Sequence, residues 1–401
     1  METVAQSRGL ESGRQVAVAT VRELVSSRAA GPDLLRALAI LLVMLWHLPA
    51  PATPAFLHEI KRYGWTGVDL FFVLSGYLIG TQLLSSVAHK QRLRVTDFYL
   101  KRSLRILPAF FTVLGLYVCL PGIRESEVMQ AAWRFLTFSM NFGLDYRFTG
   151  AFTQAWSLCV EEHFYLVLPL LVLLMTQLRW RGWTVLLACG VLFGGMALRA
   201  VLWQSTMDEP LASGATDSLA PLYLKAIYYP TYCRLDGLLF GVLLAALKIF
   251  KPDQWRRYAD PRISLAIGIF AIALAVAVFH YPTTPAFGGP LLTKVGATIG
   301  YPLFSLGCVL ILAASLEWER VFGTWRVPGA GTIAILSYSI YLTHKLTIHA
   351  DQTIFGEQAL AGTSGLFIYF ATSIAAAALL WLMVERPFLI LRARIFSRRS
   401  R

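Results

Sequence analysis

Two ionisable residues lie in one otherwise apolar stretch near the start of the chain. Arg36 and His47 are eleven residues apart (47 − 36) within segment 34–47. A helix would place them roughly 16 Å apart, about half the hydrocarbon thickness of a bilayer. A cation near one face and an imidazole deeper inside indicate a polar site within the membrane, where the imidazole could act as a general base. The structural alternative is an arginine that reaches lipid phosphate and a histidine hydrogen-bonded in a bundle.

The segment 156–165 holds a denser group, in which two carboxylates and an imidazole lead into an apolar stretch. A helix N-terminus favours a carboxylate, so one of the acids could be an ordinary helix-start residue. Two acids at the mouth of a span favour a functional role, for Glu161 ahead of Glu162. Further candidates, for an acceptor site or for a structural role, are polar and aromatic residues of other segments: Asp69, Trp156, Tyr165, Arg234, Asp236 and His344.

Two shorter motifs could bind a slender anionic ligand. Arg102 and Arg105 would share a helix face and could hold a phosphate, although anchoring of a cytoplasmic helix end is the better interpretation of these residues alone. Ser75 and Gly76 lie among bulky apolar residues, where small side chains allow either close helix packing or a narrow channel wall. The five cysteines form no Cys-x-x-Cys pair and no Cys/His metal spacing, so we expect neither a metal nor a permanently bound cofactor.

The composition indicates a membrane protein. Hydrophobic residues make up 56% of the 401 and charged residues only 15%, against about 25% charged residues in a soluble domain. We predict an all-α polytopic integral membrane protein with about ten transmembrane helices in one bundle, at 33–50, 66–86, 103–120, 160–178, 183–203, 231–250, 263–281, 296–315, 331–350 and 365–384.

Lysine and arginine gather in alternate connecting segments, which predicts that both termini are cytoplasmic. The net charge of +13 is divided among these segments rather than gathered in one patch, so we expect membrane lipids and not nucleic acid as partners. We divide the chain into a polar N-terminal tail (1–30) without the apolar core of a signal peptide, a transmembrane domain (31–390) and a basic cytoplasmic tail (391–401).

Seven motifs follow one another along the chain. They are Arg, ten residues, then His; G-V-D-L-F-F-V-L-S-G-Y-L-I; F-Y-x-K-R-x-x-R-I-x-P; W-S-L-x-V-E-E-x-F-Y; R-x-D-G-L-L-x-G; L-S-Y-S-I-Y-L-T-H; and E-R-P. In this order they resemble the membrane acyltransferase-3 family, over roughly residues 30–390. Members of that family move an acyl group, often acetyl, from a cytoplasmic donor to a hydroxyl, usually of an envelope sugar. Many members also carry an extracytoplasmic esterase-like domain, whose contribution we expect to be absent here or supplied by a partner.

The resemblance implies roles for particular residues. His47 matches the essential histidine of the family, and Arg36 matches its paired arginine. Arg102 and Arg105 match the arginine motif, and Glu161 matches the acid of the E-x-x-F-Y element. Acyl-CoA is then the expected co-substrate, with its phosphates on the three arginines.

The resemblance further implies a multi-pass O-acyltransferase of the bacterial cytoplasmic membrane. It would move an acyl group, expected to be acetyl, to a hydroxyl of a sugar or glycoconjugate on the extracytoplasmic side. The pantetheine arm would pass Ser75 and Gly76, His47 would be the general base, and Glu161 would orient its ring. An acyl-imidazole intermediate is the alternative route.

Other functions stay open at this point. A macrolide or another small metabolite is the alternative acceptor. A transporter is the alternative class, but it predicts repeat-related halves, and we find no convincing internal repeat. The acceptor, the acyl length and the oligomeric state have no signature in the sequence.

Overall fold

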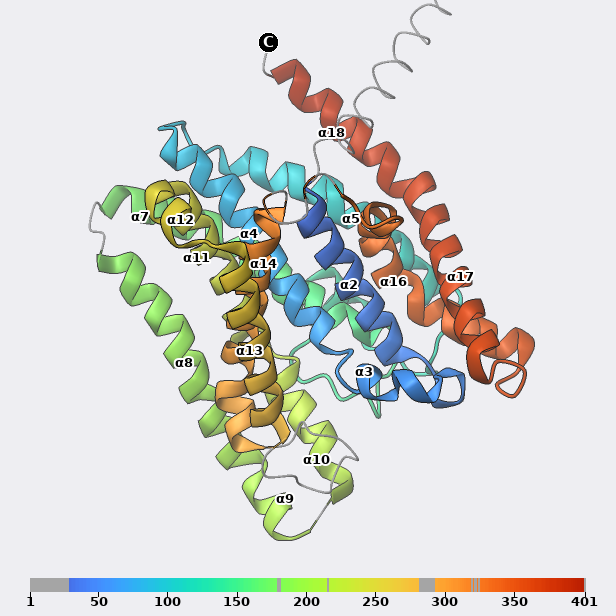
Figure 1. Ribbon diagram of the computed structural model, residues 1–401. Helices are drawn as coiled ribbons and strands as arrows, with labels where there is room; N and C mark the ends of the chain where they lie inside the picture. Colours follow the sequence, from blue (N-terminus) through green and yellow to red (C-terminus); the bar gives the residue numbers. More distant parts are fainter. Residues whose placement is uncertain are drawn as a thin grey trace, which may run out of the picture.

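The protein is a bundle of long helices, shown by a computed structural model (Figure 1). The structure describes residues 29–178, 182–214, 216–280, 293–318, 320, 323 and 325–399, among which there is no strand. The long helices are α2 (Ala30–His47), α4 (Thr66–Ala88), α5 (Val95–Cys119), α7 (Trp156–Leu178), α8 (Gly182–Thr206), α11 (Asp236–Phe250), α13 (Pro261–His280), α14 (Tyr301–Leu316), α16 (Ala330–Phe355), α17 (Gly362–Leu380) and α18 (Arg386–Arg399).

Shorter helices lie in the connections between the long ones. They are α3 (His58–Arg62), α6 (Ala132–Leu136), α9 (Asp208–Ala212), α10 (Thr216–Tyr223) and α12 (Pro252–Tyr258). Single π-helical turns precede α14 at Gly296–Gly300 and join α17 to α18 at Trp381–Glu385.

Eight helical segments of the described chain are long and apolar enough to cross a bilayer. They coincide with eight of the predicted spans, which confirms an all-α membrane protein. The other two predicted spans, 231–250 and 331–350, fold as α11 and α16. With 15 residues, α11 is only about 22 Å long, less than the hydrocarbon core. The 26 residues of α16 are long enough, but polar residues such as His344 and Lys345 lower its hydropathy.

Small residues bring α4 and α11 into close contact. A Cβ added to Gly76 would lie 2.1 Å from the carbonyl oxygen of Leu238, and one added to Gly241 would lie 2.3 Å from that of Val73. Real side chains do not fit at such distances, so glycine lets the two backbones touch. Helix α2 packs against both α4 and α16, and this places its polar residues between them.

The start of α2 and the end of α18 lie at the same end of the bundle (Figure 1). This agrees with the prediction that both ends of the bundle lie on the same side of the membrane. Which side that is stays a prediction. The predicted boundary between residues 390 and 391 falls inside α18, so the helix continues into the predicted basic tail. The predicted N-terminal tail lies outside the described residues, except for its last two positions.

Candidate active site

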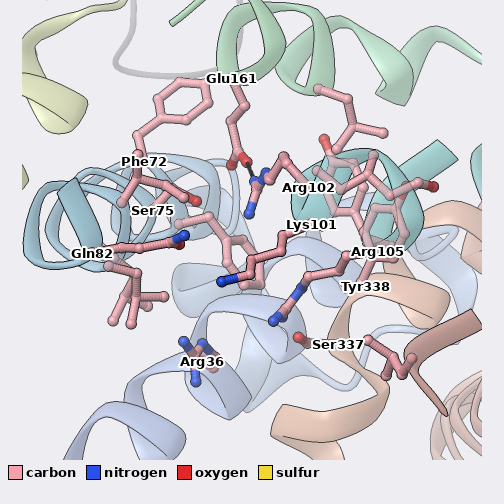
Figure 2. Close-up of a pocket in the computed structure, with 18 of the residues that line it drawn as sticks. Arg36, Phe72, Ser75, Gln82, Lys101, Arg102, Arg105, Glu161, Ser337 and Tyr338 are labelled. Carbon is pink, nitrogen blue, oxygen red and sulfur yellow. Dashed lines mark hydrogen bonds and ion pairs between the residues drawn. The ribbon is translucent and has the colours of Figure 1, made fainter. Parts of the chain in front are cut away.

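A cavity of about 610 Å³ opens between α2, α4, α5, α7, α16 and α18. Arg36 reaches it from α2, and Arg102 and Arg105 reach it from α5. Figure 2 shows Arg36, Lys101 and Arg105 pointing toward a common space. The structure therefore brings together the three arginines that were predicted as phosphate ligands, and it adds Lys101 and Arg392 to them.

One side of the cavity is held by a compact polar contact. The Oε2 atom of Glu161 lies 3.4 Å from Nη2 of Arg102 (Figure 2). Tyr165 donates its hydroxyl to the same oxygen at 2.5 Å, and the Arg102 guanidinium lies 3.7 Å from the centre of the Tyr165 ring. These contacts fix the guanidinium, which leaves less side-chain entropy to lose when it binds an anion.

Positive charge exceeds negative charge in the lining. Glu161 is the one carboxylate among the residues that line the cavity. Arg36 also has a partner, because Asp33 lies 3.0 Å away on the same helix. Within the described residues, no carboxylate pairs with Arg105 or Arg392. A lining of five cations and one carboxylate favours an anionic ligand, and guanidinium groups suit phosphate oxygens.

The cavity is elongated along α4. Its lining on that helix runs from Gln82 back to Val68, which are fourteen residues apart and therefore about 21 Å apart along the helix. Gln82 lies near the connection from α4 to α5, six residues before the end of α4, and Lys101 follows six residues into α5. The cations therefore lie toward this end. The opposite end is lined by Phe72, Ser157 and other less polar residues.

Tyr341 connects this deep end to a pair of histidines. Its hydroxyl lies 2.5 Å from that of Ser157 and donates to the backbone oxygen of Gln154 at 2.9 Å. Its ring centre lies 5.8 Å from that of His344, and the ring of His344 lies 4.8 Å from that of His47. The two imidazoles thus lie next to the cavity, separated from it by Tyr341, with His344 nearer to this side chain and His47 beyond it.

The hydrogen bonds of the two imidazoles assign their protons. In His344, Nδ1 faces the carbonyl oxygen of Tyr341 at 2.8 Å, so this nitrogen carries a hydrogen and Nε2 carries the lone pair. In His47, Nδ1 faces the carbonyl oxygen of Val43 at 2.9 Å and also lies 3.3 Å from Nε2 of His344. Nδ1 of His47 is therefore the donor, and its Nε2 keeps the lone pair that a general base needs.

A second polar group lies next to the histidines. The ammonium group of Lys345 lies 2.9 Å from Glu125 Oε1 and 2.8 Å from the hydroxyl of Thr153. Burial opposes ionisation of Glu125, but Lys345 outweighs it and lowers the pKa of this carboxyl below its ordinary value. Glu125 also accepts the backbone N–H of Phe152 at 3.0 Å. Lys345 thereby ties α16 to the connection between α5 and α7.

The predicted contact between Glu161 and the imidazole of His47 is not formed. Glu161 contacts Arg102 and Tyr165 beside the cavity, whereas the imidazole partner of His47 is His344. The prediction failed because helix order places α7 next to α5 at this depth, while α16 packs against α2. His344 was predicted as an acceptor-site or structural residue, and it occupies the place that was assigned to Glu161.

Gly76 is a packing residue and does not line the cavity, although its neighbour Ser75 does. The sequence had allowed either close helix packing or a channel wall at these two positions. The close approach of α11 assigns Gly76 to helix packing. Glu162, unlike the adjacent Glu161, does not belong to the lining either.

Asp69, Arg234 and Asp236 form buried ion pairs between elements. Arg234 Nη2 lies 2.8 Å from Asp69 Oδ1, and Arg199 Nη1 lies 2.8 Å from Asp236 Oδ2. Each of these two aspartates therefore pairs with an arginine of another element. Trp156, which was predicted as an acceptor-site or structural residue, is buried with its ring centre 5.6 Å from the Arg234 guanidinium. All four side chains are buried and lie outside the lining of the cavity.

Lys101, Tyr341 and Arg392 are among the lining residues that the sequence analysis did not predict. Lys101 lies within the basic motif of α5, and Tyr341 lies within the L-S-Y-S-I-Y-L-T-H motif, so both had a local signal. Arg392 had none, because it belongs to a basic segment that resembles an ordinary membrane anchor.

A family model for acyltransferase domains, acyltransferase-3, matches residues 30–383. The chain belongs to this family. All the lining helices except α18 lie inside the matched range. No solved structure matches the acyltransferase chain.

Curated relatives of this acyltransferase are bacterial. The peptidoglycan O-acetyltransferase OatA of Listeria monocytogenes is 27% identical over 328 residues, which cover 78% of this chain and 48% of the relative. A putative O-acetyltransferase of Staphylococcus aureus (strain COL) is 25% identical over 384 residues, 89% of this chain and 57% of the relative. The O-acetyltransferase OatA of Staphylococcus aureus is 23% identical over 335 residues, 78% of this chain and 49% of the relative. The chain thus spans about half the length of these relatives.

Proposed function

We propose that the protein is an O-acyltransferase of the bacterial cytoplasmic membrane. It would move an acyl group, acetyl in the first instance, from cytoplasmic acyl-CoA to a hydroxyl of a sugar or glycoconjugate on the extracytoplasmic side. Membership in the acyltransferase-3 family supports acyl transfer, and the names of the relatives support an O-linked product. Because the Listeria relative is named for peptidoglycan, peptidoglycan fragments are the first acceptors to test.

One observation carries the proposal: the cavity has its cations at one end and Tyr341 at the other, and the histidine pair lies next to Tyr341 outside the lining. Acyl-CoA has the matching polarity, with phosphates at one end and a thioester at the end of a slender arm. If the phosphates bind to the arginines, the arm extends beside Ser75 and the thioester comes to the deep end. A length of about 21 Å suits an extended arm better than a compact ligand.

The protonation assigned to His47 and His344 allows His47 to act as a general base in this reaction. The acceptor oxygen would form a bond to the thioester carbonyl carbon while Nε2 of His47 takes its proton. The carbon–sulfur bond would then break, and the leaving thiolate would take that proton from His47. The positive charge that develops on His47 would be stabilised through its Nδ1–H by the lone pair on Nε2 of His344, at 3.3 Å.

Radiolabelled acetyl-CoA tests the proposal directly. Purified protein in lipid nanodiscs should release label to water or to a peptidoglycan fragment. His47→Ala should reduce this by at least about a hundredfold, as expected when a general base is removed. His89→Ala is the matched control, since that ring is exposed and contacts the backbone oxygen of Ser85. If His47→Ala retains the wild-type rate while acetyl-CoA is consumed, the assignment of the base is wrong.

The same preparation separates the two routes of transfer. Direct transfer requires donor and acceptor to be bound together, whereas an acyl-imidazole on His47 would give ping-pong kinetics and label on the protein. The hydrogen-bond pattern suits both routes, because the lone pair that the contacts of Nδ1 leave on Nε2 of His47 can act as a base or as a nucleophile.

A further inference from the structure

The C-terminal helix α18 supplies one face to the cavity. Leu389, Arg392, Ala393 and Phe396 all line it. Their spacing of three, four and seven residues from Leu389 places them along one stripe of the helix, so α18 lies beside the cavity over two turns. This helix begins after the range that matches the family model ends at residue 383.

Arg392 adds to the cationic end of the cavity. It interacts electrostatically with Arg102, and Arg105 interacts with both of them and with Arg36. Four guanidinium groups around one cavity repel each other, and Glu161 is the one carboxylate among the lining residues. A ligand with more than one anionic group would compensate this charge, whereas a single phosphate would leave part of it unpaired.

Phe396 and Lys101 lie together at the cationic end of the cavity. The ammonium group of Lys101 is 4.6 Å from the centre of the Phe396 ring. Arg105 follows Lys101 by four residues on α5, about 6 Å deeper along the helix. The α18 stripe therefore combines a guanidinium, an aromatic ring and a neighbouring ammonium at the end of the cavity opposite Tyr341.

We propose that α18 binds the adenosine 3′-phosphate portion of coenzyme A, with Arg392 on the 3′-phosphate and Phe396 against the adenine. The inference rests on the proposed function, since it assumes an acyl-CoA donor. In the proposed reaction the thioester reaches the end next to Tyr341, so the adenosine lies at the opposite, cationic end, where Arg392 and Phe396 of α18 line the cavity. Arg36, Arg102 and Arg105 then hold the pyrophosphate. The site would thus select free acyl-CoA over an acyl-phosphopantetheine carried by a protein, which has no adenosine.

Binding of coenzyme A and of 3′-dephospho-coenzyme A to the full chain in nanodiscs tests this subsite. Wild-type protein should bind coenzyme A about tenfold more tightly, as one charge-assisted contact implies. Arg392→Gln should remove this preference by weakening the binding of coenzyme A alone, and Arg392→Lys should restore part of it. Arg394→Gln is the matched control, because Arg394 lies on the same helix, is exposed and does not line the cavity.

The outcomes separate the subsite from the function. If wild-type protein binds both ligands and Arg392→Gln keeps the preference or weakens both equally, the subsite is wrong and acyl-CoA remains the donor. If wild-type protein discriminates but Arg394→Gln loses the discrimination as fully as Arg392→Gln, the effect is not specific to the cavity face, and the subsite is again overturned. If wild-type protein binds neither ligand, the acyl-CoA donor and the subsite both fail.

Discussion

At the scale of single residues, His344 is the side chain that would prepare His47 for proton transfer in the proposed reaction. Its Nδ1 is fixed by backbone oxygens of its own helix, so its Nε2 can only accept. His47 presents Nδ1 to that lone pair and to Val43. A histidine held in one tautomer needs no rearrangement before it removes a proton, and the neighbour that holds it then also stabilises the imidazolium.

This arrangement predicts a difference between two substitutions of His344. Phenylalanine keeps the bulk of the ring but accepts no hydrogen bond, whereas the side-chain oxygen of glutamine can still accept from His47. We expect His344→Phe to lower kcat by roughly one to two orders of magnitude with an unchanged KM for acetyl-CoA, and His344→Gln to lose less. Steady-state kinetics with the pH profile of each variant measures this. Equal activity of the two variants would show that His344 only fills space.

At the scale of elements, the contact between α4 and α11 holds one wall of the cavity in place. Ser75 lines the cavity from α4, while Gly76, next to it, contacts the backbone of α11. Because lining and packing residues are neighbours on α4, a change in the distance between α4 and α11 also moves the cavity wall. The buried Arg234–Asp69 pair connects the start of α11 to α4 in the same region.

Gly241→Ala tests the α4–α11 contact without touching the cavity, because Gly241 is not among its lining residues. The added Cβ would meet the Val73 carbonyl at 2.3 Å, and overpacking of this kind costs about 1–3 kcal/mol. We expect a lower midpoint of thermal unfolding in detergent and weaker coenzyme A binding. Gly115→Ala on α5 is the control, since its Cβ has no atom within 4 Å and alanine favours the helix. Equal midpoints for the two variants would contradict close packing as the reason for glycine.

At the scale of the whole molecule, hydropathy predicted the positions of the helices, and the ordered motifs predicted that Arg36, Arg102 and Arg105 would meet. Apolar length is a local property, so it can be read along the chain. The pairing of His47 with His344 joins positions 297 residues apart and depends on α16 packing beside α2, for which no local pattern exists. The role of Arg392 was hidden for the same reason, because only the fold brings α18 back to the cavity.

The orientation of the bundle decides whether the proposed chemistry is possible. The end of α18 and the start of α2 lie at one end of the molecule, and α3 follows the opposite end of α2 (Figure 1). The charge bias predicts that the cationic end of the cavity faces the cytoplasm, where acyl-CoA is found, and that α3 faces outward. Single cysteines at Arg394 and at Glu59, whose side chain is 81% exposed, report the two sides once the exposed Cys119 and Cys189 are replaced.

A membrane-impermeant maleimide should label Glu59→Cys in intact spheroplasts, and it should label Arg394→Cys only after permeabilisation. Labelling before and after permeabilisation provides the internal control, because each cysteine must react in at least one condition. The reverse pattern would place the arginine cluster outside the cell. Cytoplasmic acyl-CoA could then not reach it, and the donor would have to be an anion of the extracytoplasmic side. The location of one residue of α18 thus tests the donor independently of any measurement of activity.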